Sequence, residues 1–177
     1  AAAAPLDNDS IKTAVAAWLS DSAAAEVTYG HITSWDTSQV TDMSSLFCAH
    51  HSLSSCNTAA LSFNEDIGTW DTSGVTSMYA MFGSNEGFNR DLSDWAVDSV
   101  TDMSYMFSYA RSFNQDLGWC VDDGANLDYA FSSTLCESTS CGVTQGGCAS
   151  WFGSDAAPKT QFTSFGALLG AAALLML

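Results

Sequence analysis

The chain has 177 residues, and its 20 acidic against 4 basic side chains set a formal net charge of −16. Such a surface repels phosphate backbones and anionic lipid headgroups, which argues against a nucleic-acid partner. The length suits one ordinary domain. The acidity itself has two interpretations, which are solvation of an extended surface and the binding of a cation such as calcium.

The chain opens with Ala1 to Pro5 and without a methionine, which is typical of a mature product, a fragment or an incomplete gene product. No signal peptide can be recognised in these residues, although one could precede them. Asp7 or Ser10 can cap a helix whose apolar residues recur at helical spacing. We expect this helix to reach about Ala25 within a capping region, residues 1–29, that covers the apolar end of a repeat array.

Between residues 30 and 131 one phrase of residue types recurs. It reads Phe-Asn-x-Asp-Leu/Ile-x-x-Trp, and its tryptophan starts Trp-Asp-Thr-Ser-x-Val-Thr-x-Met or a decayed form of it. Trp95 follows Trp70 by 25 residues, and Trp119 follows Trp95 by 24. Self-similarity at this period predicts stacked repeats rather than a globular enzyme domain.

Within each repeat the apolar residues keep a fixed phase. Val-x-x-Met suits a short extended piece that passes into a helical turn, and Asp-Leu/Ile before Trp suits a second extended piece. We therefore expect a repeat solenoid of the α+β or mostly β class over residues 30–131. It would have about four leucine-rich-repeat-like parallel β coils with short helical turns. Its core would hold the apolar phases, as in Val75, Met78, Met81, Phe82, Phe88 and Leu92.

One repeat contains an insertion. Phe47 and Phe63 are sixteen positions apart, whereas Phe82 and Phe88 are six apart, so ten residues have been added. An added loop on one face is typical of repeat proteins. The insertion holds His50 and His51, which are interpreted as solvated because no neighbouring acid or cysteine pair completes a metal site.

Three asparagines share one phase beside the apolar core: Asn64, Asn89 and Asn114. Their side chains are expected to form a structural ladder by bonding backbone groups of neighbouring turns. Three acids follow two positions later: Asp66, Asp91 and Asp116. The chain lacks the Gly-Gly-x-Gly-x-Asp repeat of calcium-binding β-rolls, so calcium stays an open alternative and no metal ligand or other cofactor is predicted.

Six cysteines, an even number, indicate disulfides in a secreted chain: Cys48, Cys56, Cys120, Cys136, Cys141 and Cys148. Proximity in the sequence pairs them in that order, two by two, although other pairings are open. The last four are expected to staple a C-terminal cap, residues 132–152, over the final coil. Zinc is the competing interpretation, but the Cys-x-x-Cys spacing is absent.

The last segment, residues 153–177, has a spacer and a hydrophobic tail. Small residues near Ser154 and Asp155 precede a polar stretch and then thirteen apolar residues from Phe165 to Leu177. This order predicts a glycosylphosphatidylinositol attachment signal. A truncated transmembrane helix and a packed C-terminal helix are the alternatives, because a full span needs about 20 apolar residues.

The repeated phrases resemble those of the BspA-like leucine-rich-repeat surface proteins, and the resemblance covers about Gly30 to Phe131. It implies a secreted or cell-surface recognition or adhesion protein, whose ligand is an extracellular protein or glycan, and it implies no catalytic residues. The insertion after Phe47, the stretch Ala96-Val97-Asp98 and the cysteine-rich end depart from the family's pattern.

Two functions follow from the sequence. The first is a non-enzymatic recognition module in the extracellular space or on the cell surface, with anchorage through the tail as an option. The second is a secreted carbohydrate-active or other enzyme that uses the repeats as a scaffold. We favour the first because no catalytic motif interrupts the repeats. The ligand-binding residues are unknown at this point.

Overall fold

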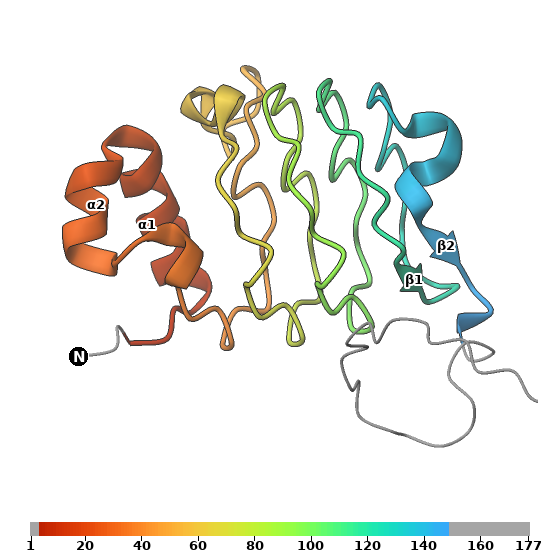
Figure 1. The fold of residues 1–177 in the computed structure, drawn as a ribbon, viewed down its shortest axis with the longest axis horizontal. Helices are drawn as coiled ribbons and strands as arrows, with labels where there is room; N and C mark the ends of the chain where they lie inside the picture. The colour runs from red at the N-terminus through yellow and green to blue at the C-terminus, as the bar shows by residue number, and fades with distance from the viewer. Residues whose placement is uncertain (1–3, 149–177) are drawn as a thin grey trace, which may run out of the picture.

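The computed structural model describes residues 4–148. Two helices, α1 (Asn8–Ser20) and α2 (Ser22–Tyr29), lie at one end (Figure 1). Four units then follow side by side, and they begin at Trp35, Trp70, Trp95 and Trp119. The chain also contains short elements. They are the 3₁₀ helices η1 (Ile32–Ser34), η2 (Thr58–Ser62) and η3 (Glu137–Gly142), and the strands β1 (Cys120–Val121) and β2 (Thr144–Gln145).

Helix α1 starts at a reciprocal cap. Asp7 accepts the backbone N–H of Ser10 at 2.8 Å, and the Ser10 hydroxyl accepts the N–H of Asp7 at 2.8 Å. Such a capping box satisfies two of the N–H groups that a helix start leaves free. The predicted single helix to Ala25 is wrong, because the backbone of Asp21 is extended and its carboxylate caps a second helix, α2.

The apolar face of α1 covers the first unit. Ile11, Ala14, Val15 and Trp18 are buried on it. Polar contacts set its position, because Asn8 Oδ1 accepts the backbone N–H groups of two successive residues of the first unit, Thr41 and Asp42, at 2.8 and 3.1 Å. The helix thereby closes the apolar end of the first unit, which would otherwise face water.

The predicted solenoid of leucine-rich-repeat-like parallel β coils is wrong. Within residues 4–148 the only strands are β1 and β2, which are two residues long each and pair in parallel. The earlier units meet through isolated parallel bridges in one column, Asp42 with Ser77, Ser77 with Asp102 and Asp102 with Asn126. The units consist mainly of turns and loops rather than sheet.

The bridges do not extend into strands because the residue three positions after each bridging residue has a positive φ angle. Ser45, Ala80, Tyr105 and Tyr129 have φ angles of 60°, 49°, 59° and 56°. A strand needs successive residues in the extended region, at φ of about −120° to −140°. Each bridge therefore cannot continue into a ladder, and the backbone turns instead.

Backbone hydrogen bonds between units remain regular without a sheet. The inward residues Met43, Met78 and Met103 each donate their N–H to a carbonyl of the next unit, at 2.9, 2.8 and 2.8 Å. These methionines are fully buried. Because the donors sit beside the core, these bonds satisfy groups that water cannot reach.

Aromatic rings fill the core in stacked rows. Phe47, Phe82, Phe107 and Phe131 have ring centroids 5.6, 5.2 and 6.0 Å apart along the row. The tryptophans form another row, in which the indole N–H of each later member donates to the carbonyl three residues before the preceding tryptophan, as Trp95 does to the Ile67 oxygen at 3.1 Å. The inward placement of these repeated phases agrees with the sequence prediction.

Three disulfides join all six cysteines. Cys48 pairs with Cys56 in the insertion, as sequence proximity predicted. The other two predicted pairs are wrong, because Cys120 pairs with Cys148 and Cys136 pairs with Cys141.

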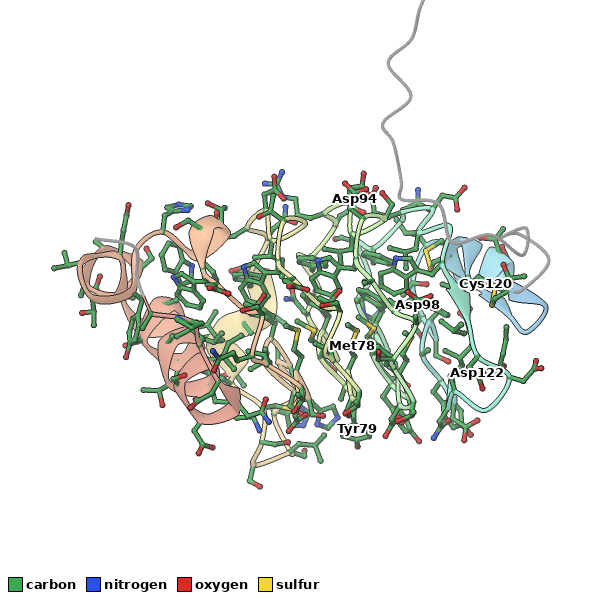
Figure 2. All side chains as sticks on the ribbon, turned by 90° about the horizontal axis from the view of Figure 1, so that it is seen from below. Met78, Tyr79, Asp94, Asp98, Cys120 and Asp122 are labelled. Carbon is green, nitrogen blue, oxygen red and sulfur yellow. A yellow bond between two sulfur atoms is a disulfide. The ribbon has the colours of Figure 1, made fainter. Side chains whose placement is uncertain are left out.

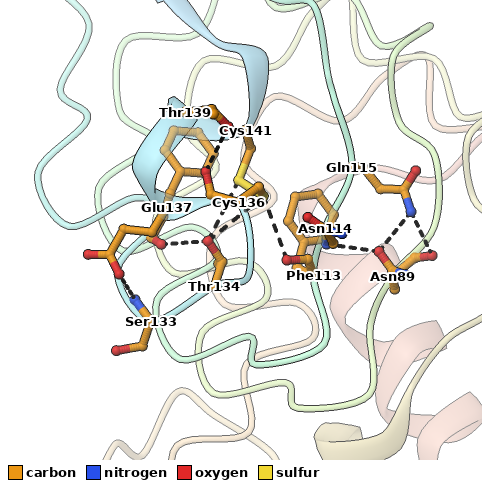
Figure 3. The surroundings of a disulfide bond; sticks show 11 residues. Asn89, Phe113, Asn114, Gln115, Ser133, Thr134, Cys136, Glu137, Thr139 and Cys141 are labelled. Carbon is orange, nitrogen blue, oxygen red and sulfur yellow. Dashed lines mark hydrogen bonds between the residues drawn. A yellow bond between two sulfur atoms is a disulfide. The ribbon is translucent and has the colours of Figure 1, made fainter.

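The register of the strands explains this outcome. Cys120 lies beside Thr144, so the chain that leaves β2 brings Cys148 back to β1. Figure 3 shows the Cys136–Cys141 bond beside Phe113, where it closes η3. The predicted boundaries of the cap and of the other segments remain predictions, and the hydrophobic tail lies outside the described residues.

Candidate recognition surface

Three tyrosines form a row on the outside of successive units. The ring centroids of Tyr79 and Tyr105 are 6.1 Å apart, and those of Tyr105 and Tyr129 are 5.1 Å apart. The exposed fraction is 40% for Tyr105 and rises to 62% for Tyr129. We call Tyr79, Tyr105 and Tyr129 the tyrosine row, which places aromatic surface in solvent rather than in the core.

The backbone does not require tyrosine at these positions. Tyr105 and Tyr129 lie in the left-handed region, which a bulky side chain adopts rarely. Ser45 and Ala80 occupy the same position in the first two units with the same sign of φ. Since serine and alanine meet the structural need there, the two exposed rings are not explained by the fold, and such departures mark candidate functional positions.

Two acidic residues lie near the row: Asp102 precedes Tyr105 by three positions, and the backbone carbonyl of Asp128 accepts the N–H of Tyr105 at 2.9 Å. Asp102 Oδ1 accepts the backbone N–H and the hydroxyl of Ser104 at 2.9 and 2.6 Å. The next unit carries Asp128, which is exposed and adjacent to Tyr129 in the chain. The row therefore lies in a locally acidic environment, in agreement with the charge of the whole chain.

The basic side chains of the described residues are engaged in other contacts. Lys12 pairs with Asp42 at 3.0 Å, and Arg111 lies 3.4 Å from Glu86. Arg90 donates to the carbonyl of Asn64 at 2.7 Å. None of these contacts involves Asp102 or Asp128, so in the part of the chain described these two carboxylates have no basic partner.

A groove opens at the N-terminal end of the row. It has a volume of about 480 Å³ and lies between α1 and the first two units. Val15, Leu19 and Leu46 supply apolar lining, Lys12 lies at its edge, and Tyr79 belongs to its wall. Because Tyr79 is part of both features, the groove and the tyrosine row form one continuous surface.

Asp42, the ion-pair partner of Lys12 at the edge of the groove, has a lowered pKa. Partial burial alone would raise the pKa of Asp42, but hydrogen bonds from Ser44 and the ion pair with Lys12 outweigh this effect and hold it below its ordinary value. The groove thus carries a compensated charge pair at its edge rather than a free cation.

The acids of the turns between units are acceptors of local hydrogen bonds. The hydroxyl of Ser38 and then its N–H lower the pKa of Asp36, and Ser73 does the same for Asp71. Figure 2 shows Asp98 and Asp122 in the middle of the view, between Tyr79 and Asp94, which lie on opposite sides. Asp36 and Asp71 therefore stabilise turns, and Asp94 lies on the side of the molecule opposite Tyr79.

The predicted asparagine ladder residues lie in line. Asn64 Oδ1 accepts the N–H of Asn89 at 2.9 Å. Asn89 Oδ1 accepts the N–H of Asn114 at 2.9 Å, as Figure 3 shows. Gln115 adds a bond to the same oxygen of Asn89 at 2.7 Å. These amides link neighbouring units, so their role is structural.

Metal ligation has no support from the described residues. They contain no group of three or more histidine, cysteine or acidic side chains placed to hold an ion. His50 and His51 stack with their ring centroids 5.1 Å apart in the insertion, and Cys48 is already bonded to Cys56. The acids Asp66 and Asp91 each accept a backbone N–H two residues on.

Residues 19–140 match the model of a family described as a Mycoplasma protein of unknown function, DUF285. The chain belongs to this family. Neither a curated protein nor a solved structure matches it. In residues 4–148, no helix of this family member has both the length and the apolar character needed to cross a membrane.

Sequence reasoning missed the tyrosine row because it followed the inward phases. A signal was nevertheless present, since Tyr79 comes one residue after Met78, and Tyr105 comes two residues after Met103. Tyr129 comes two residues after Leu127, which holds the methionine phase in the last unit. Only the spatial arrangement shows that these three side chains meet on one surface.

Proposed function

We propose that this chain is a non-enzymatic recognition or adhesion module, secreted or displayed on the cell surface, of the kind found in BspA-like surface proteins. Its ligand is an extracellular protein or glycan, and the tyrosine row is the binding surface. The observation that carries the proposal is the presence of exposed rings where the same backbone accepts Ser45 and Ala80.

Tyrosine suits such a surface for a physical reason. Its ring offers a large contact area with few rotatable bonds, and its hydroxyl bonds to polar groups at the edge of an interface. Aromatic residues are enriched at the energetic centres of protein interfaces. The groove beside Tyr79 adds a concave apolar site of about 480 Å³ next to the rings, which is the size range of a ligand pocket.

The extracellular location is supported by the cysteines. All six are joined in disulfides, and disulfides persist mainly in oxidising compartments. The acidic surface also favours solubility and suppresses association with anionic lipids and nucleic acids.

The enzymatic alternative has less support. The groups whose pKa departs from the ordinary value are aspartates, and each shift is downward. Their causes include serine hydrogen bonds in local turns. A carboxyl that acts as a general acid near neutral pH needs a raised pKa instead.

An array experiment tests the proposal. The purified chain and the double variant Tyr105→Ser/Tyr129→Ser are applied to arrays of extracellular proteins and of glycans. We expect at least one ligand that binds the native chain and loses binding to the variant. The proposal is wrong if no ligand depends on these tyrosines while both chains show the same thermal unfolding.

A further inference from the structure

We propose that the tyrosine row and the acidic residues near it bind an extended, cationic polypeptide segment, with lysine or arginine side chains on the rings and an apolar side chain in the groove. This inference rests on the proposed function and names the chemical class of its ligand. It draws on charge, on ring geometry and on the position of the groove.

Charge favours a basic partner. The described residues near the row include Asp102 and Asp128, whose carboxylates have no basic partner there. The chain as a whole carries a formal charge of −16. A cationic segment is therefore attracted over a distance, and its charges replace the missing partners at contact.

The rings supply a second attraction. A lysine or arginine cation over a tyrosine face is stabilised by the ring quadrupole, more strongly where water is displaced. Tyr129 is 62% exposed, and Tyr105 is 40% exposed. Tyr105 and Tyr129 stack on each other with 19° between their planes, so the ring face of Tyr129 that points away from Tyr105 is the one open to a cation.

The spacing of the rings fits an extended chain. Alternate side chains on one face of a strand are about 6.6 Å apart. The ring centroids along the row are separated by 6.1 and 5.1 Å. Consecutive side chains on one face of a bound segment can thus reach consecutive tyrosines.

The groove sets the direction of the segment. It adjoins Tyr79 and is lined by apolar side chains of α1 and Leu46. An apolar residue at one end of the segment can enter it, while the basic residues that follow lie along Tyr105 and Tyr129. A neutral glycan would use the rings but would have no need of the adjacent carboxylates.

A peptide titration tests this assignment. The probe is a synthetic peptide with leucine at its start and lysine at every second position after it, and its counterpart has glutamine in place of lysine. We expect the lysine peptide to bind more tightly than the glutamine peptide. Tyr105→Ser/Tyr129→Ser should weaken binding of the lysine peptide by about tenfold, and Asp128→Asn by about threefold.

Two control variants separate local binding from general attraction to an acidic protein. Asp94→Asn removes the same charge as Asp128→Asn, but from the side of the molecule opposite Tyr79 (Figure 2). Val27→Ala removes an exposed apolar side chain, 89% accessible, from α2. We expect both controls to retain native affinity, and thermal unfolding of all variants to match that of the native chain.

Several results would overturn the assignment. Equal weakening by Asp94→Asn and Asp128→Asn would show non-specific charge attraction. Equal binding of both peptides would show that cations are not recognised. Binding of neutral oligosaccharides through the same tyrosines, without binding of the lysine peptide, would leave the recognition module intact but exclude a cationic ligand. The proposed recognition function has its own test in the arrays, and it fails if no ligand depends on the tyrosines.

Discussion

Asn89 accepts the backbone N–H of Asn114 through its side-chain Oδ1 at 2.9 Å, which ties one unit to the next across 25 residues of sequence. The same oxygen also accepts a bond from Gln115. The side-chain amide of Asn89 thus joins its own unit to two adjacent residues of the following unit.

Replacement of Asn89 by alanine should lower the free energy of unfolding by about 1 kcal/mol, because the N–H of Asn114 then loses its protein acceptor. Urea unfolding at equilibrium measures this loss. Asn114→Ala is the matched control, since no described residue of a following unit donates to its side chain. A change below a few tenths of a kcal/mol for Asn89→Ala would mean that water replaces the bond fully.

Met103→Asp should unfold the protein. The Met103 side chain is completely buried in the core, and its backbone joins two units, so a carboxylate there has neither water nor a cation nearby. Circular dichroism with thermal unfolding tests this prediction. Ser112→Asp, at an exposed position of the same unit, adds the same group and should unfold as the native chain does. A native-like unfolding temperature for Met103→Asp would contradict the placement of Met103 in the core.

The two disulfides at the C-terminal end should contribute different amounts to the free energy of unfolding. Cys120 and Cys148 are 28 residues apart in the sequence, whereas Cys136 and Cys141 are 5 apart. Loop-closure entropy gives about 3.6 kcal/mol for the longer loop and about 2 kcal/mol for the shorter one. Pairwise replacement by serine and urea unfolding measure both values. Peptide mapping without reduction checks the connectivity, and a Cys120–Cys136 peptide would contradict it.

The turn carboxylates predict a loss of stability in acid. Serine hydrogen bonds hold the pKa of Asp71 and Asp91 below the ordinary value of 3.8 in the folded chain. Because the folded pKa lies below the unfolded one, this stabilisation is present above the unfolded pKa and is lost as pH falls through the lowered folded pKa. The unfolding temperature should therefore decrease below about pH 4.

Asp71→Asn offers a direct comparison for this acid effect. Its amide oxygen can still accept from Ser73 but does not titrate, so the variant should lose less stability than the native chain between neutral and acid pH. Thermal unfolding across this range measures the difference. An identical pH profile for both chains would show that the turn at Asp71 makes no contribution to acid sensitivity.

The prediction for the C-terminal tail concerns residues outside the described range. If the tail is a glycosylphosphatidylinositol signal, a eukaryotic host should cleave the chain near Ser154 or Asp155 and attach the lipid. Phosphatidylinositol-specific phospholipase should then release the protein from the membrane. Mass spectrometry that finds Leu177 still present in the mature chain would exclude this anchor.

The sequence by itself determined which positions lie in the core. Apolar residues such as Met78 and Phe82 recur with the period of the tryptophans, and burial of apolar surface is the main stabilising term of folding, so the repeated phases had to lie inward. The cap of α1 was also readable, because Asp7 and Ser10 act within one turn of chain.

Only the tertiary structure decided how the units meet. The same residue pattern is compatible with a sheet or with turns, and the left-handed backbone at Ser45 and Ala80 favours turns. The pairing of Cys120 with Cys148 likewise depends on the register of β1 and β2 rather than on distance in the sequence. The tyrosine row emerges in the same way, because periodicity identifies outward positions while their neighbours in space depend on how adjacent units align.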